Sequence, residues 1–170
     1  MRIGLISDNH HAYDRLELAL DKLLGEGIDL LLHAGDMGHE KVLARLKALQ
    51  TPAYAVFGNN DYGFLEQRPN YAVEVEPWCF AVGDLKVKLM HIPKWLHPEG
   101  ADLVVFGHTH VPMARLHGQS LLVNPGEVCG RESGLTQCAI AQREKSGWRV
   151  RQFHHGGAQW HEENLELVFE

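Results

Sequence analysis

Four short clusters of metal-binding residue types recur in order along the chain. They combine carboxylates, one amide and imidazoles, the donor types that suit Mn, Fe, Co, Ni or Zn when no thiolate takes part. A single Gly-Asp pair begins many ordinary turns, but four such clusters in sequence predict a metal-dependent site. The clusters are Asp8-x-His10, Gly35-Asp36, Gly58-Asn59-x-Asp61 and Gly107-His108-x-His110.

Each cluster directly follows an apolar run that is typical of a buried β-strand. These runs cover residues 3–7, 28–33, 53–57 and 101–106. Leucines at helical spacing predict helices over residues 13–26 and about 40–49, between the first three strands. Alternating strands and helices predict βαβ units with a parallel sheet, and ligands bind at the carboxyl ends of such strands. The sequence therefore places all four clusters at one edge of a sheet.

The second half of the chain is predicted to be rich in β-strands separated by turns. A final strand over residues 165–169 is expected to follow a polar, Gly-rich stretch. No repeat or linker interrupts the chain, so we expect a single domain over residues 1–170. The other predicted strands cover residues 71–75, 79–82, 85–91, 112–116, 121–124, 136–142 and 148–154.

Composition excludes several classes of protein. Hydrophobic residues make up 45% of the chain, which favours a globular fold over disorder, and no apolar run approaches the ~18 residues of a membrane span. The net charge of −6 argues against broad nucleic-acid binding through a basic surface. The N-terminal residues lack a signal-peptide pattern, so a cytoplasmic location is expected. Three cysteines without C-x-x-C spacing indicate plain thiols. The sequence leaves a homo-oligomer open.

The order of these clusters resembles the calcineurin-like metallophosphoesterase superfamily, whose pattern is D-x-H, G-D, G-N-x-D/E, H and G-H-x-H. The resemblance runs from Arg2 to at least Gly126, and the segment Leu122-Val123-Asn124-Pro125-Gly126 is similar to the small YfcE-like phosphodiesterases. It implies the metallo-dependent phosphatase fold, an α/β four-layer α-β-β-α sandwich of two mixed β-sheets.

The resemblance also implies two divalent metal ions, most often manganese in this family, with Fe, Ni, Co and Zn open. One ion would take Asp8, His10, Asp36 and His110, and the other would take Asp36, Asn59, His91 and His108. The side chains of residues two apart in an extended segment point the same way, which would let Asp8 and His10 bind the same ion. The implied reaction is attack by metal-bound hydroxide on phosphorus, with no side-chain nucleophile.

Several positions depart from the family pattern. Asn60 stands where many members carry a histidine that assists the leaving group, and an amide cannot deliver a proton at neutral pH. Asp61 could orient a ligand or fix its turn, and His11 could donate a proton to substrate, cap the next helix or face solvent. His91 is followed by Ile-Pro instead of the usual glycine. Glu127 replaces a frequent serine, with no consequence that the sequence predicts.

Two classes of function are consistent with these residues. The first is an enzyme, a phosphodiesterase or general phosphoesterase acting on a small phosphoester or nucleotide-type substrate. The second is a scaffold on the same fold, as in the small subunit of retromer, which also lacks the catalytic histidine. Scaffolds tend to lose metal ligands, whereas all the ligand types are present here, so the enzyme is favoured. The acidic balance weakens a third hypothesis, a nuclease.

Overall fold

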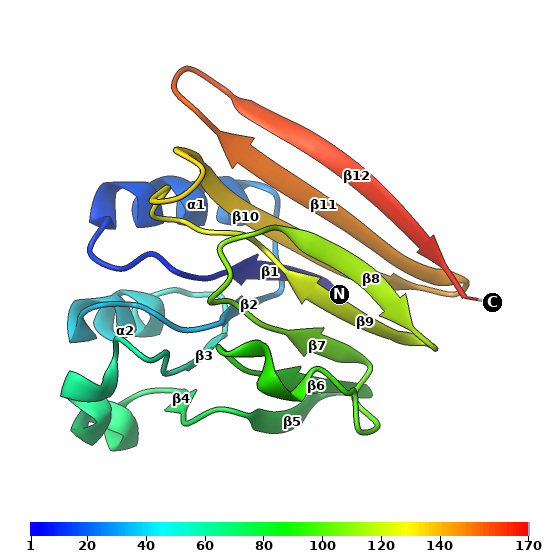
Figure 1. Ribbon diagram of the computed structural model, residues 1–170, viewed down its shortest axis with the longest axis horizontal. Helices are drawn as coiled ribbons and strands as arrows, with labels where there is room; N and C mark the ends of the chain where they lie inside the picture. Colours follow the sequence, from blue (N-terminus) through cyan, green and yellow to red (C-terminus); the bar gives the residue numbers. More distant parts are fainter. Residues whose placement is uncertain (170) are drawn as a thin grey trace.

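The structure, a computed structural model, describes residues 1–169 and contains two packed β-sheets (Figure 1). The first sheet begins with four parallel strands joined by helices on one face. Its helices are α1 (Tyr13–Gly25) and α2 (Glu40–Lys47), and its first strands are β1 (Arg2–Ile6), β2 (Leu30–His33), β3 (Ala53–Val56) and β4 (Val73–Glu74). The predicted βαβ start is therefore confirmed, with helix ends within two residues of the predicted ones.

Three antiparallel strands extend this sheet on the other side of β1. They are β10 (Thr136–Glu144), β11 (Gly147–His155) and β12 (Trp160–Val168), and the order across the sheet is β12-β11-β10-β1-β2-β3-β4. β12 starts five residues before the predicted strand. Its first residues were not predicted as a strand because the outward side chains of β12 are mostly polar. Arg151 on β11 binds Glu162 on β12 at 2.8 Å, and the apolar face is limited to positions such as Leu165 and Leu167.

The second sheet has five strands in the order β5-β6-β7-β9-β8. Its central strands are parallel and its outer strands are antiparallel, so both sheets are mixed, as the sequence predicted. The strands are β5 (Trp78–Val82), β6 (Leu85–Leu89), β7 (Leu103–Val105), β8 (Met113–His117) and β9 (Ser120–Asn124). A 3₁₀ segment, η1 (Tyr62–Asn70), links β3 to β4 and was not predicted.

The layers follow from the alternation of side chains along each strand. Leu31 of β2 packs with α1 and α2, whereas Leu30 and Leu32 point to the opposite face and pack against the second sheet. The outer face of the second sheet is covered by the loop that contains η2 (Pro93–Trp95), with Leu96 packed on a small apolar cluster. No helix within residues 1–169 combines the length and apolar composition that a bilayer span requires.

Candidate metal centre

The predicted ligands lie at the carboxyl ends of strands from both sheets. Asp8, Asp36 and Asn59 follow β1, β2 and β3, while His91 follows β6 and His108 follows β7. In Figure 1 these strand ends meet at one side of the sandwich, below α1 and beside α2. The site therefore joins the two sheets at their shared edge.

Two glycines let these loops approach one another. A Cβ atom added to Gly58 would lie 2.2 Å from Asp36 Oδ1, and one added to Gly107 would lie 2.0 Å from Ser7 Oγ and 2.7 Å from Asp8 Oδ2. Neither position could accept a side chain without moving a carboxylate of the site. The glycines of the Gly-Asn and Gly-His pairs are thus required for packing as well as for turning.

The first group of side chains surrounds Asp8. The carboxylate oxygen Oδ1 of Asp8 lies 3.2 Å from Nε2 of His110, and the rings of His10 and His110 are 5.6 Å apart between centroids. Asp8, His10 and His110 each offer a ligand atom within 4.8 Å of the others. Among the described residues, neither Asp8 Oδ1 nor His10 Nε2 has a hydrogen-bond partner, and both atoms are buried. Buried polar atoms without a partner are costly, and a bound cation would satisfy both.

The second group surrounds Asp36. Its Oδ2 atom lies 3.4 Å from His91 Nε2 and 3.8 Å from His10 Nε2, so Asp36 lies between the two groups. His91 Nε2 also lies 3.1 Å from Asn59 Oδ1 and 3.3 Å from His108 Nδ1. Asp8, Asp36 and His91 form a second set of ligand atoms within 4.8 Å. The structure therefore brings all seven predicted ligands together, including His91, the one outside the four sequence clusters.

Five of these seven residues have a left-handed backbone. Their φ angles are 55° for Asp8, 47° for His10, 56° for Asp36, 66° for His108 and 59° for His110. This conformation is uncommon outside glycine and clusters at functional sites, where the surrounding structure maintains it. The expectation that an extended segment aligns Asp8 with His10 was wrong, because both residues turn the chain. Their side chains nevertheless converge through these turns.

Burial and neighbouring charges shift the pKa values of several residues of the site, among them Asp36, His110 and His10. Burial opposes ionisation of Asp36, but the neighbouring His91 and two hydrogen bonds from Asn60 outweigh it and lower the pKa of Asp36. Contact with Asp8, opposed by burial and aided by Glu127, raises the pKa of His110 to about 9. Burial, followed by the positive charge of Arg131, lowers the pKa of His10. His10 is therefore held neutral, the form that can bind a metal.

The two residues after Asn59 serve neighbouring loops. Asn60 donates to both carboxylate oxygens of Asp36, from its backbone N–H at 2.9 Å and from its amide Nδ2 at 2.6 Å. Asp61 is buried and accepts hydrogen bonds from the backbone N–H groups of Met37, Gly38 and Gly58. Asp61 thus ties the loop after β2 to the loop after β3, which corresponds to the turn-fixing alternative.

His11 faces solvent, one of the alternatives that the sequence left open, whereas Glu127 makes a contact that the sequence did not predict. His11 is exposed and is not among the described residues that line the hollow of about 380 Å³ beside His10, Asp36 and Asn60. Glu127 is fully buried, and its Oε2 atom lies 2.7 Å from His110 Nδ1. The proline and glycine before Glu127 marked a turn, but no local pattern indicated that this turn reaches His110.

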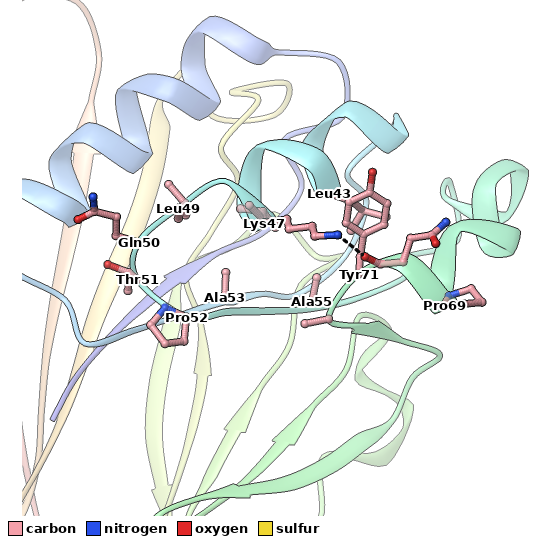
Figure 2. Close-up of a pocket in the computed structure, with 13 residues that line it drawn as sticks. Leu43, Lys47, Leu49, Gln50, Thr51, Pro52, Ala53, Ala55, Pro69 and Tyr71 are labelled. Atoms are coloured by element: carbon pink, nitrogen blue, oxygen red, sulfur yellow. Dashed lines mark hydrogen bonds between the residues drawn. The ribbon is translucent and has the colours of Figure 1, made fainter.

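A second hollow, of about 550 Å³, lies away from these ligands (Figure 2). It is lined by the last turn of α2, the start of β3 and Tyr71, and Lys47 crosses it to bind the backbone oxygen of Asn70 at 3.1 Å. No predicted ligand lines it. Trp78 packs against Tyr54 and Phe80.

A sandwich of two mixed sheets with Asp, Asn and His side chains at its shared edge defines a class, the metal-dependent phosphoester hydrolases. Residues 1–146 match the calcineurin-like phosphoesterase superfamily domain, and the chain belongs to this superfamily. A phosphodiesterase of Methanocaldococcus jannaschii is 26% identical over 161 residues, covering 88% of this chain and 97% of that protein. A probable metallophosphoesterase of Methanothermobacter thermautotrophicus is 32% identical over 140 residues, covering 74% and 76%.

Solved structures share the fold over nearly the whole chain. Vacuolar protein sorting 29 of Cryptosporidium parvum matches with a TM-score of 0.75 at 19% identity, over 97% of both chains. YfcE, a phosphoesterase from E. coli, matches with a TM-score of 0.66 at 22% identity, over 89% of this chain and 91% of that one. These matches confirm the predicted fold.

Proposed function

We propose that this protein is a phosphodiesterase that uses two divalent metal ions, with manganese the first to test. One observation carries the proposal. Within residues 1–169, Asp8 Oδ1 and His10 Nε2 are buried without a hydrogen bond, in a cluster whose seven side chains are all metal-binding types. Fe, Ni, Co and Zn suit the same oxygen and nitrogen donors.

The residues present fit two ions that share Asp36. Asp8, His10, Asp36 and His110 would hold one ion, because the first, second and fourth already converge within 4.8 Å. Asp36, Asn59, His91 and His108 would hold the other, with His91 in contact with the other three. When bound, the ions supply positive charge to phosphoryl oxygens and activate water as a nucleophile.

The surrounding residues prepare the ligands for this role. Nδ1 of His91 lies 2.8 Å from the backbone oxygen of Ala34, so it carries the ring proton and leaves Nε2 for an ion. Glu127 does the same for His110 through Nδ1. Asn60 holds both oxygens of Asp36 in place. These contacts fix ring orientation and tautomer before a substrate arrives.

A small phosphoester or nucleotide-type diester is the proposed substrate. The Methanocaldococcus relative is named a phosphodiesterase, which supports the diester. Asn60 favours esters with good leaving groups, since an amide cannot protonate a poor one. The exposed hollow at the site, lined by His10, Asn60 and Val111 among others, leaves room for a small organic group.

The test is hydrolysis of bis-p-nitrophenyl phosphate beside p-nitrophenyl phosphate. The protein is stripped with a chelator and reloaded with Mn, Ni, Co, Zn or Mg, and Asp36→Asn serves as the inactive control. We expect metal-dependent cleavage that is faster for the diester and lost in the variant. A folded protein that binds two ions without turnover would instead support the scaffold function.

A further inference from the structure

A single buried carboxylate organises the turn that follows β9. Oε1 of Glu127 accepts hydrogen bonds from the backbone N–H groups of Glu132 and Ser133 and from the Ser133 hydroxyl, at 2.6–2.8 Å. Oε2 accepts from the backbone N–H of Arg131 at 2.9 Å and contacts His110 at 2.7 Å. Glu127 is fully buried, so these bonds are shielded from water. The same side chain therefore fixes a predicted metal ligand and the residues 131–133.

Two glycines and one arginine complete the shape of this turn. Gly130 and Gly134 have φ angles of 66° and 76°, and the N–H of Gly134 donates to the oxygen of Gly130 at 3.1 Å. A Cβ atom on Gly130 would lie 2.0 Å from Nη1 of Arg15, which donates to the backbone oxygen of Gly134. The turn is held on both sides, and its outer residue, Arg131, has a fixed backbone position.

Arg131 lies beside the proposed metal centre. It lines the same hollow as His10, Asp36 and His110. Within residues 1–169, its guanidinium makes no hydrogen bond or ion pair, although Glu132 also lines the hollow. A guanidinium whose backbone is anchored and whose donors are free is suited to binding an oxyanion.

We propose that Arg131 is a substrate-binding residue that donates to a phosphoryl oxygen of the reacting ester, and that Glu127 positions it. This inference rests on the proposed phosphoesterase function. The guanidinium matches the geometry of phosphate oxygens with two parallel N–H donors. Glu132, an exposed carboxylate outside the proposed ligand set, also lines the hollow, and Arg131 offsets its negative charge on that side of the site.

The test compares Arg131→Gln and Arg131→Lys with the unaltered protein, all loaded with the same metal. We expect Arg131→Gln to raise KM for bis-p-nitrophenyl phosphate and the inhibition constant of inorganic phosphate by about tenfold, the size of one charge-assisted hydrogen bond. Arg131→Lys should recover part of this loss, since it restores the charge without the planar donors. Both substitutions keep the backbone N–H that binds Glu127.

Arg115→Gln is the matched control, because Arg115 is exposed on β8 and lines no part of the hollow. It removes the same charge and should leave both constants unchanged. Calorimetric binding of inorganic phosphate to the metal-loaded protein separates this inference from the proposed function. Weaker phosphate binding in Arg131→Gln alone supports the role of Arg131 even if no ester is cleaved. Equal phosphate binding and equal KM in Arg131→Gln would overturn it.

Discussion

Oε2 of Glu127 lies 2.7 Å from Nδ1 of His110, and the other ring nitrogen of His110 lies 3.2 Å from Asp8. The three residues come from loops after β9, β7 and β1, which are far apart in the sequence. A carboxylate on the far side of a ligating imidazole fixes its tautomer and raises its basicity. The loop after β9 is thus part of the metal centre although it supplies no ligand.

Loss of this carboxylate should weaken metal binding. Glu127→Gln keeps the size of the side chain but removes the charge that faces His110, and partners of this kind are worth about 10–100-fold in metal affinity. We expect a drop of that size in manganese affinity by calorimetry. Glu132→Gln, in the same turn but exposed, is the control and should change affinity little. Equal affinities in the two variants would show that Glu127 serves only the turn.

Restoring a histidine at position 60 should change leaving-group preference. Asn60→His places an acid where an amide now binds Asp36, and general acid catalysis is typically worth 10²–10⁴-fold. We expect turnover of esters with alkyl leaving groups to rise more than turnover of nitrophenyl esters, by about tenfold, because the Asn60–Asp36 bond is lost at the same time. Asn60→Ala removes that bond alone. Equal gains on both ester types would argue against a missing acid.

Metal removal should destabilise the fold, because the proposed ligands join two sheets. A ligand that binds only the folded state adds about 2.7 kcal/mol at one hundred times its Kd. For a chain of this length that corresponds to a Tm increase of roughly 5–10 °C. Calorimetric scans after chelator treatment and after manganese addition would measure it. Asp36→Asn should lose most of this metal-dependent shift, and a full shift in that variant would contradict the bridging role.

The left-handed backbone of the ligands should appear as strain in stability measurements. His108 has a φ of 66° and an exposed side chain, so its substitution removes few contacts. Without metal, His108→Gly should be more stable than His108→Ala by about 1 kcal/mol, since only glycine adopts this conformation freely. Urea unfolding of both variants gives the difference. Thr109→Gly and Thr109→Ala form the matched pair, because Thr109 has no positive φ, and there alanine should be the more stable.

Acid should remove one identifiable contribution to stability. Glu26 lies 2.6 Å from Lys22 Nζ and 2.7 Å from Arg151 Nη1, and these hydrogen bonds lower its pKa. Its stabilisation is therefore present above the unfolded pKa of about 4.3 and is lost as pH falls through the lower folded pKa. Glu26→Gln should be less stable at pH 7 by about 0.5 kcal/mol, because partial exposure screens the pairs. The difference should vanish near pH 2, and a constant difference would exclude ionisation as its cause.

The proposed metal ligands were more predictable from the sequence than the residues that hold them in place. Asp8, Asp36 and Asn59 stand directly after apolar strands, and topology alone brings such strand ends to one edge. His91 was predicted only through family resemblance, since a histidine before Ile-Pro carries no local signal. Glu127 was missed because its partners, His110 and Ser133, depend on how two loops fold against each other. Such contacts follow from tertiary packing and leave no periodic pattern in the chain.

The fold was predictable where burial imposes a pattern. Strands such as β2 and β7 are buried on both faces and are therefore continuous apolar runs. β12 lies at a sheet edge with an exposed polar face, and η1 has no buried residue, so neither carries such a run. The positive φ angles could not be predicted from the sequence either, because Asp and His adopt them only when neighbouring loops require it.

The position of β1 has a consequence for the order in which the protein assembles. β1 is made well before β10, yet it lies between β2 and β10, and its partner residues on β10 are Ala139 to Gln142. A nascent chain that ends before β10 already contains every proposed ligand, but one edge of the strand that leads to Asp8 is still open. Open strand edges pair readily with other chains. During synthesis, the chain therefore contains all the proposed ligands before β10 covers the open edge of β1, the strand that leads to Asp8.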